Sequence, residues 1–201
     1  MSAHPLDVIL HPNSIAVAGA SPTGRGGGFL TPMIELGYKG KIYPVNPKYQ
    51  EIMGFKTYPT VRDIPDAVDY VISSIPATEA LKLVDDCAVK GVKAIHFFTA
   101  RFSETGRPDA ADLEKEVLRR CKAANIRIIG PNCMGVLYPA WGMSFFGGMS
   151  NKSGPIGVAS QSGGAVGDII DTMNGKNLFC SKAISYGNAL DLNEADYLEY
   201  F

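Results

Sequence analysis

Short hydrophobic runs alternate along the chain with longer stretches in which hydrophobic and polar positions recur with a helical period. The short runs predict strands at residues 14–17, 41–45, 70–75, 94–99 and 127–129. The longer stretches predict helices at residues 26–36, 78–90 and 109–124. The last helix is the best marked, because Pro108 and Asp109 suit its start and Leu113, Val117 and Cys121 form a stripe spaced by four.

A strand, a helix and the next strand in regular alternation predict parallel strands joined by right-handed crossovers. The expected fold class is therefore α/β, with a Rossmann-like doubly wound parallel sheet. In such sheets ligands bind beyond the carboxyl ends of the strands. The turns that follow the strands are the places where function is expected.

Residues 139–154 interrupt this alternation, because they are rich in Gly and Ser and show no hydrophobic period. They predict a linker between a first domain, residues 1–138, and a second, residues 155–201. In the second domain the pattern predicts strands at 156–159 and 180–186, a helix at 164–173 and another from residue 194. Two strands are too few for a stable sheet. We therefore expect this domain to be truncated or to complete its sheet with a segment outside the chain.

The composition is that of a globular protein, with 46% hydrophobic and 19% charged residues. A net charge of −1 gives no overall attraction to nucleic acid or to an anionic membrane. No apolar run reaches the roughly 18 residues that a membrane helix needs, and the first ten residues do not have the pattern of a signal peptide. We expect a cytoplasmic protein that binds neither nucleic acid nor membrane.

The four cysteines and three histidines are scattered along the chain. Their spacing suits neither a disulfide framework nor a zinc site. No metal site is predicted.

The turn after the first predicted strand, residues 19–28, is rich in glycine. Glycine lets a ligand approach the backbone closely, and the free N–H groups at the start of the next helix attract a phosphate. Two common phosphate-binding motifs do not fit. The dinucleotide fingerprint needs a glycine where Ser21 stands and an acid at the end of the second strand, and the P-loop needs Lys where Arg25 stands.

Lys48 follows the second predicted strand, where a dinucleotide-binding domain has its acid. A cation there suits a ribose that carries a phosphate, as in NADP and coenzyme A (CoA), rather than a free ribose diol. The alternative is that Lys48 is a solvated lysine and that the glycines only form a turn. The residues alone leave these interpretations open.

A set of short segments occurs in order along nearly the whole chain. They are SIAVAGAS from residue 14, GKIYPVNPK from 40, SIPA from 74, IGPNCMG from 129, GVASQSGG from 157, SYGNA from 185 and DYLEYF from 196. The ordered set resembles the NDP-forming acyl-CoA synthetases, the family of ADP-forming acetyl-CoA synthetases and succinyl-CoA synthetase α-subunits. The resemblance implies a CoA-binding domain followed by an incomplete flavodoxin-like ligase domain.

The resemblance implies a reaction that interconverts acyl-CoA, NDP and phosphate with acid, CoA and NTP, through an acyl phosphate and a phosphohistidine. The family's histidine lies beyond residue 201, and His4, His11 and His96 do not match it, so we expect no catalytic residue in this segment. The resemblance also implies ATP/ADP or GTP/GDP with Mg²⁺ on a missing or partner domain. The expected partners are a carboxylic acid or acyl-CoA and an ATP-grasp β-type subunit or fused domain, within an oligomer.

The resemblance assigns CoA contacts to the turns that follow the strands of the first domain. The assigned residues are Gly19, Ser21, Thr23, Gly24, Arg25, Lys48, Ile75, Pro76, Phe98, Thr99, Ala100, Asn132 and Cys133. Cys133 lies near the reactive end of CoA in this assignment. The sequence offers no base to activate it, so a packing or thiol-lining role is expected rather than a nucleophile.

A second polar turn, with Ser160, Ser162, Gly163 and Gly164, joins a predicted strand to a helix. Hydroxyls and free helix N–H groups suit a phosphoryl group, and the resemblance implies that this helix faces the phosphohistidine. A plain helix N-cap is the alternative. Gly167 stands where succinyl-CoA synthetases have a tyrosine near the substrate, so we expect an acid other than succinate.

Two other functions stay open from the sequence. One is a non-catalytic, CoA-binding regulatory module, which a downstream Gly-His-x-Gly loop would argue against. The other is an NADP-dependent oxidoreductase, for which CoA binding without NADP binding would be contrary evidence.

Overall fold

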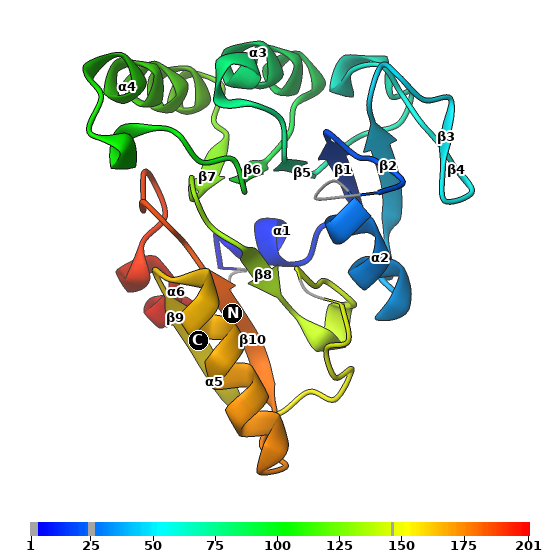
Figure 1. Cartoon of the computed structure of the whole chain (residues 1–201), viewed down its shortest axis with the longest axis vertical. Coiled ribbons are helices and arrows are strands. Elements are labelled where there is room, and N and C mark those ends of the chain that lie inside the picture. Colours follow the sequence, from blue (N-terminus) through cyan, green and yellow to red (C-terminus); the bar gives the residue numbers. More distant parts are fainter. Residues whose placement is uncertain (1–3, 24–26, 146) are drawn as a thin grey trace.

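The computed structural model describes residues 4–23, 27–145 and 147–201 (Figure 1). Its larger sheet has five strands in the order β2-β1-β5-β6-β7, and every neighbouring pair is parallel. The strands are β1 (Ser14–Ala18), β2 (Lys41–Val45), β5 (Tyr70–Ser73), β6 (Ala94–Phe97) and β7 (Arg127–Ile129). The predicted Rossmann-like, doubly wound fold is confirmed, with its switch in strand order between β1 and β5.

Helices cover both faces of this sheet. Figure 1 shows α3 (Ala80–Lys90) and α4 (Pro108–Ala123) above it, and α1 (Asp7–Leu10) and α2 (Gly27–Glu35) below it. Alternate side chains of β1 serve the two faces: Ile15 and Val17 join one buried cluster, and Ala16 and Ala18 the other. None of the helices in the described residues is long and apolar enough to cross a bilayer.

Short 3₁₀ helices complete the first part of the chain. They are η1 (Val61–Asp63), η2 (Ala77–Glu79) and η3 (Ser103–Thr105), and η4 (Pro139–Trp141) follows later. A small hairpin of β3 (Glu51–Ile52) and β4 (Phe55–Lys56) follows β2. Its strands are two residues long each, too short to show an alternating pattern, and they were not predicted from the sequence.

A second sheet has the order β8-β10-β9. Its strands are β8 (Gly135–Leu137), β9 (Ile156–Ser160) and β10 (Cys180–Ser185), and its helices are α5 (Gly163–Gly175) and α6 (Glu194–Tyr200). β8 was not predicted from the sequence; it has three residues and pairs antiparallel with β10. This strand comes before the predicted linker, so residues assigned to the first domain contribute to the second sheet. The division into domains at 138 and 155 stays a prediction.

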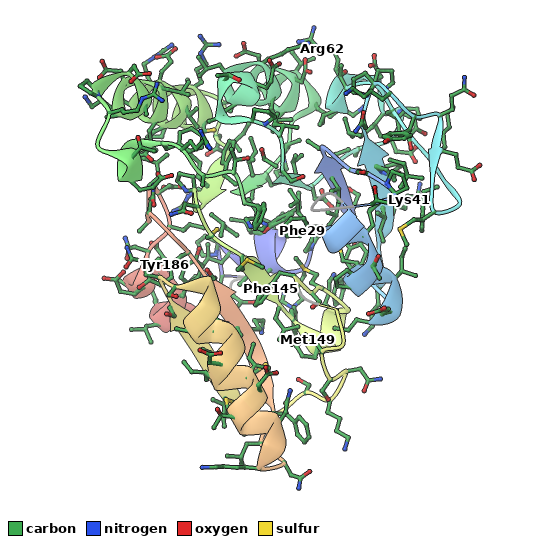
Figure 2. All side chains as sticks on the ribbon, in the orientation of Figure 1. Phe29, Lys41, Arg62, Phe145, Met149 and Tyr186 are labelled. Carbon is green, nitrogen blue, oxygen red and sulfur yellow. The ribbon has the colours of Figure 1, made fainter. Side chains whose placement is uncertain are left out.

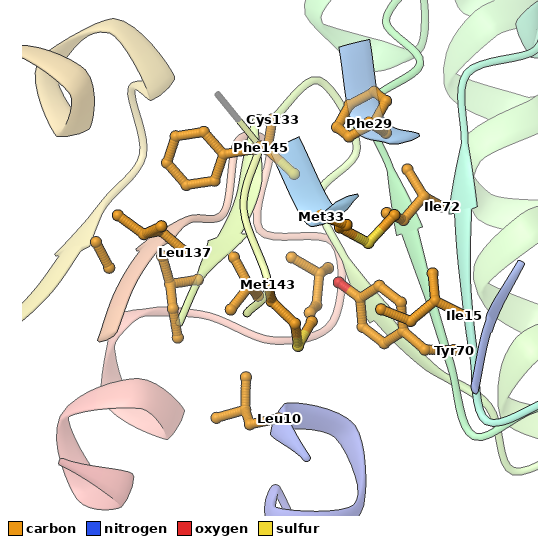
Figure 3. Packing of buried hydrophobic residues seen from close by; sticks show 14 of the residues in the cluster. Leu10, Ile15, Phe29, Met33, Tyr70, Ile72, Cys133, Leu137, Met143 and Phe145 are labelled. Carbon is orange, nitrogen blue, oxygen red and sulfur yellow. The ribbon is translucent and has the colours of Figure 1, made fainter. Parts of the chain in front are cut away.

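One hydrophobic core joins the two sheets. Figure 3 shows Ile15 and Ile72 of the larger sheet on one side of it and Leu137 of β8 on the other. Met143 and Phe145, from the predicted linker, are buried within it, and Figure 2 shows Phe145 and Phe29 in the region between the sheets. The segment expected to be a linker is therefore partly a core element.

The polypeptide after β10 also runs against the larger sheet. The Leu192 and Leu190 N–H groups donate to the carbonyl oxygens of Ile128 (3.2 Å) and Gly130 (3.0 Å). Asp191 accepts from the guanidinium of Arg127 at 2.8 Å. These bonds hold the second sheet next to the carboxyl end of β7.

Candidate functional site

Two adjacent clefts lie beyond the carboxyl ends of the larger sheet. The first cleft, about 570 Å³, is lined by the turns after β1, β2 and β5 and by α3. The second cleft, about 870 Å³, is lined by the turns after β5, β6 and β7, by α4 and by the start of α5. Ser74, Ile75 and Pro76 line both clefts, so the two share a wall. Together they follow the edge of the sheet across its switch point, where ligands of such folds bind.

The turn after β1 requires glycine at its first position. Gly19 has φ +86°, and a Cβ there would lie 2.9 Å from Oγ of Ser74. Its N–H donates to the Val45 carbonyl oxygen at 2.9 Å. The absence of a side chain lets three neighbouring turns meet closely and leaves the backbone open to a ligand. Of the next assigned residues, Ser21 is half-buried and Thr23 is exposed, and the Thr23 N–H donates to Oγ of Ser21 at 3.3 Å.

Asn46 connects the turns after β1 and β2. Its Nδ2 donates to the Ala20 carbonyl oxygen at 2.8 Å, and its Oδ1 accepts from the Lys48 N–H at 2.9 Å. Asn46 was not among the residues assigned from the sequence, although an Asn-Pro pair directly after a strand is typical of a turn held by the Asn side chain. Asn46 therefore fixes the position of Lys48 at the mouth of the first cleft.

Lys48 is exposed and lines the first cleft. Within the part of the chain that the structure describes, its ammonium group forms no ion pair. A free cation beside Gly19 suits an anionic group in the cleft. Gly24 and Arg25, also assigned to the ligand, lie outside the described residues.

The Thr99 side chain holds the backbone of the turn after β5 in place. It is buried, and its hydroxyl donates to the Ile75 carbonyl oxygen at 2.8 Å while lying 3.1 Å from the Ser73 hydroxyl. It thus fixes the wall that the two clefts share. Phe98 and Ala100, on either side of it, line the second cleft.

The turn after β7 brings Asn132 and Cys133 to the second cleft. The Asn132 N–H donates to the Thr99 carbonyl oxygen at 3.0 Å, so adjacent strand ends are tied together. Cys133 is buried, and its thiol contacts the Phe97 carbonyl oxygen at 3.8 Å. Burial raises the pKa of the Cys133 thiol, which keeps it protonated and unsuited to act as a nucleophile.

The start of α5 closes the second cleft from the side of the second sheet. Gly163 and Gly164 line it, and a Cβ on Gly163 would lie 2.1 Å from Cγ of Met134. Neither assigned hydroxyl is among the lining groups. Oγ of Ser162 accepts from the Ala165 N–H at 3.2 Å, and Oγ of Ser160 accepts from the Ser162 N–H at 3.3 Å. Both serines therefore stabilise the helix start, and the glycines face the cleft.

Comparison with known proteins decides the family. Residues 13–139 match the family described as "CoA binding domain", and residues 153–201 match "Succinyl-CoA ligase like flavodoxin domain". The chain belongs to the CoA-binding domain family. The resemblance found in the sequence is thus confirmed.

The known relatives of this chain are longer proteins. It is 38% identical to an ADP-forming acetate–CoA ligase of Methanocaldococcus jannaschii, covering 98% of the chain and 28% of the relative. It is 36% identical to the α subunit of an ADP-forming acetate–CoA ligase of Pyrococcus furiosus, covering 98% and 44%. A structure titled dinucleotide forming acetyl-coenzyme A synthetase 1 of Ca. Korarchaeum cryptofilum, with phosphate and ADP, matches with a TM-score of 0.89 and 36% identity, covering 97% and 42%. The chain therefore spans less than half the length of these relatives.

The lining of the two joined clefts suits a CoA molecule. At one end of the joined clefts, Gly19 lies so close to Ser74 that a Cβ would not fit between them, and Lys48 supplies a free cation. Asn132, Cys133 and Gly163 lie at the other end. A long ligand with a phosphorylated nucleotide at one end and a narrow arm at the other matches this arrangement.

Proposed function

We propose that this chain holds CoA for an ADP-forming acid–CoA ligase. One observation carries the proposal: the first and second clefts share the wall of Ser74, Ile75 and Pro76 and run from Lys48 to the start of α5. In this proposal the phosphorylated adenosine end lies in the first cleft, and the thiol arm crosses the shared wall into the second. The thiol then lies between residues of both sheets.

The proposed contacts follow the strand ends. Backbone N–H groups of the turn that starts at Gly19 bind the phosphates, and Lys48 pairs with the ribose phosphate. Phe98 and Ala100 contact the pantetheine arm, while Asn132 and Cys133 surround the thiol. Gly163 and Gly164 leave backbone N–H groups of α5 available to a phosphoryl group. The buried Cys133 contributes packing.

The remaining steps are proposed for groups outside residues 1–201. A phosphohistidine carries the phosphoryl group, and ATP or ADP with Mg²⁺ binds an ATP-grasp domain, fused or on a β-type subunit. The phosphate and ADP named for the Korarchaeum relative and the α-subunit name of the Pyrococcus relative support this division. We propose a small carboxylic acid as substrate, since those two relatives are named for acetate or acetyl groups.

Calorimetric titration of the chain with CoA, dephospho-CoA and NADPH tests the proposal. We expect CoA to bind, dephospho-CoA to bind more weakly because it lacks the ribose phosphate, and NADPH not to bind measurably. Lys48→Ala should weaken CoA binding about 10-fold, the size of a charge-assisted interaction. The same change should leave dephospho-CoA binding within about 2-fold.

Lys115→Ala is the matched control, because Lys115 is exposed, pairs with Asp112 at 3.0 Å and lines neither cleft. Its affinity for CoA should equal that of the unchanged chain. Tighter binding of NADPH than of CoA would refute the proposal. Equal losses for CoA and dephospho-CoA in Lys48→Ala would show that Lys48 does not contact the ribose phosphate.

A further inference from the structure

Arg101 has an unusual backbone conformation at the edge of the second cleft. It follows β6 and Ala100, lines the cleft, and has φ +79°. This left-handed region is unfavourable for any residue with a Cβ, and a bulky one there is a conformational outlier. Such outliers persist where the surrounding structure holds them, and they cluster at ligand sites.

Contacts from both sheets hold the turn of Arg101. The carboxylate of Glu104 accepts from the Arg101 N–H and, at 3.1 Å, from the Phe102 N–H. Asn188, in the segment after β10, donates to the same carboxylate at 2.7 Å. The fully buried ring of Phe102 packs on Phe97, with the ring centroids 6.1 Å apart. The Glu104 carboxylate thus accepts hydrogen bonds from two backbone N–H groups and from the side-chain amide of Asn188.

The Arg101 guanidinium has no partner within residues 4–23, 27–145 and 147–201. It differs in this from every other arginine in those ranges, since all the others form ion pairs. Arg107, which lines the same cleft, pairs with Asp109. Arg101 is therefore an unpaired cation that a strained turn directs to the cleft edge.

We infer that Arg101 binds an oxyanion in the second cleft, at the end that the proposed function gives to the CoA thiol. A guanidinium binds the planar edge of a carboxylate or two oxygens of a phosphate with paired hydrogen bonds. At the thiol end such an oxyanion has two sources: a carboxylate at the far end of the acyl group, or inorganic phosphate. Arg101 is thus a specificity-determining or substrate-positioning residue of the proposed ligase, and the inference rests on that proposed function.

The test compares two acyl-CoA ligands of equal carbon number, glutaryl-CoA and valeryl-CoA, with phosphate as the second arm. Each is titrated calorimetrically into the unchanged chain and into Arg101→Gly, the phosphate in the presence of saturating CoA. Glycine suits the backbone at residue 101, so this variant should fold with an equal or higher melting temperature. Arg119→Ala is the control, because Arg119 pairs with Glu116 on α4 and lines neither cleft.

We expect Arg101→Gly to weaken either glutaryl-CoA or phosphate about 10-fold or more, and CoA and valeryl-CoA less than about 3-fold. Loss confined to glutaryl-CoA identifies an acyl carboxylate, and loss confined to phosphate identifies phosphate. Unchanged affinity in both arms, or an equal loss for CoA, valeryl-CoA and glutaryl-CoA, would overturn the inference and leave the proposed function standing. Failure of the unchanged chain to bind CoA would overturn the proposed function, and this inference with it.

Discussion

Several polar side chains at the clefts form hydrogen bonds with the protein backbone and do not point toward a ligand. Thr99 and Asn46 hold neighbouring turns together, and Ser162 stabilises a helix start. These bonds fix the strand ends, so that the ligand-facing groups are backbone N–H groups, small residues and a few cations. A motif that names a polar residue therefore does not reveal whether its side chain faces the ligand.

His96 shows how burial sets the state of a single residue. It is 1% exposed in β6, and its Nε2 lies 3.2 Å from the Cys133 carbonyl oxygen. Burial lowers the pKa of His96 from 6.5 to about 4. The unfolded chain therefore takes up this proton at a higher pH than the folded chain, and stability should be lost as the pH falls from about 6.5 to 4, by up to about 3 kcal/mol.

Urea unfolding at pH 7.5 and pH 4.5 measures this loss. His96→Gln keeps a side chain that can hydrogen-bond but does not titrate, so its free energy of unfolding should fall less between the two pH values. The difference between the two proteins isolates the histidine from the carboxylates. Parallel pH dependences would show that His96 is not buried in its neutral form.

At the scale of elements, the strand ends carry the site and the helix starts complete it. The turn after β5 forms the wall that the two clefts share, and the start of α5, which belongs to the other sheet, lines the second cleft. The position of α5 depends on a close contact, because Gly163 packs directly on Met134. The first turn of α5 therefore packs on Met134 and also lines the second cleft with the backbone of its glycines.

Ser162→Ala tests the capping role that the structure gives to this side chain. Loss of the bond from the Ala165 N–H should lower the free energy of unfolding by about 1 kcal/mol, within the usual range of about 0.5–2 kcal/mol for a lost cap. Ser153→Ala, at an exposed position before β9, is the control and should change stability by less than about 0.5 kcal/mol. A Ser162→Ala protein of unchanged stability but weakened phosphate binding would mean that the hydroxyl serves the ligand.

At the scale of the whole molecule, the second cleft exists because the two sheets share a core. Leu137 and Val136 of β8, Phe145 of the predicted linker and Tyr197 of α6 belong to the same buried cluster as Ile15 of β1. In addition, the Tyr200 hydroxyl of α6 donates to Asp7 of α1 at 2.9 Å. The two parts are therefore expected to lose their structure together.

Thermal or urea unfolding should show one transition by two probes. Far-UV circular dichroism reports both sheets, and the fluorescence of Trp141, the only tryptophan, reports the region of η4. Leu137→Ala should shift both transitions equally and lower stability by about 2–4 kcal/mol, because it leaves a cavity in the shared core. Leu198→Ala, at a side chain 67% exposed, should have little effect. Separate transitions by the two probes would show that the sheets unfold independently.

Much of the larger sheet and of the first cleft could be predicted from the sequence. Strands with long hydrophobic runs, such as β1 and β5, were predicted close to their observed bounds, because burial on both sides leaves a continuous hydrophobic signal. β8 was missed because three residues carry no period. Asn46, Glu104 and Arg101 were missed because their roles depend on backbone angles and on partners distant in the sequence.

The sequence by itself determined the alternation of the five strands of the larger sheet with its three longer helices, the glycine required after β1 and the family, since these depend on local patterns and on ordered motifs. The tertiary structure decided that β8 joins the second sheet, that residues of the predicted linker are buried, and that α5 closes a cleft begun by β5, β6 and β7. Packing of segments far apart in the chain sets these features, and the alternation of hydrophobic and polar residues in one segment carries no information about which other segment will cover it.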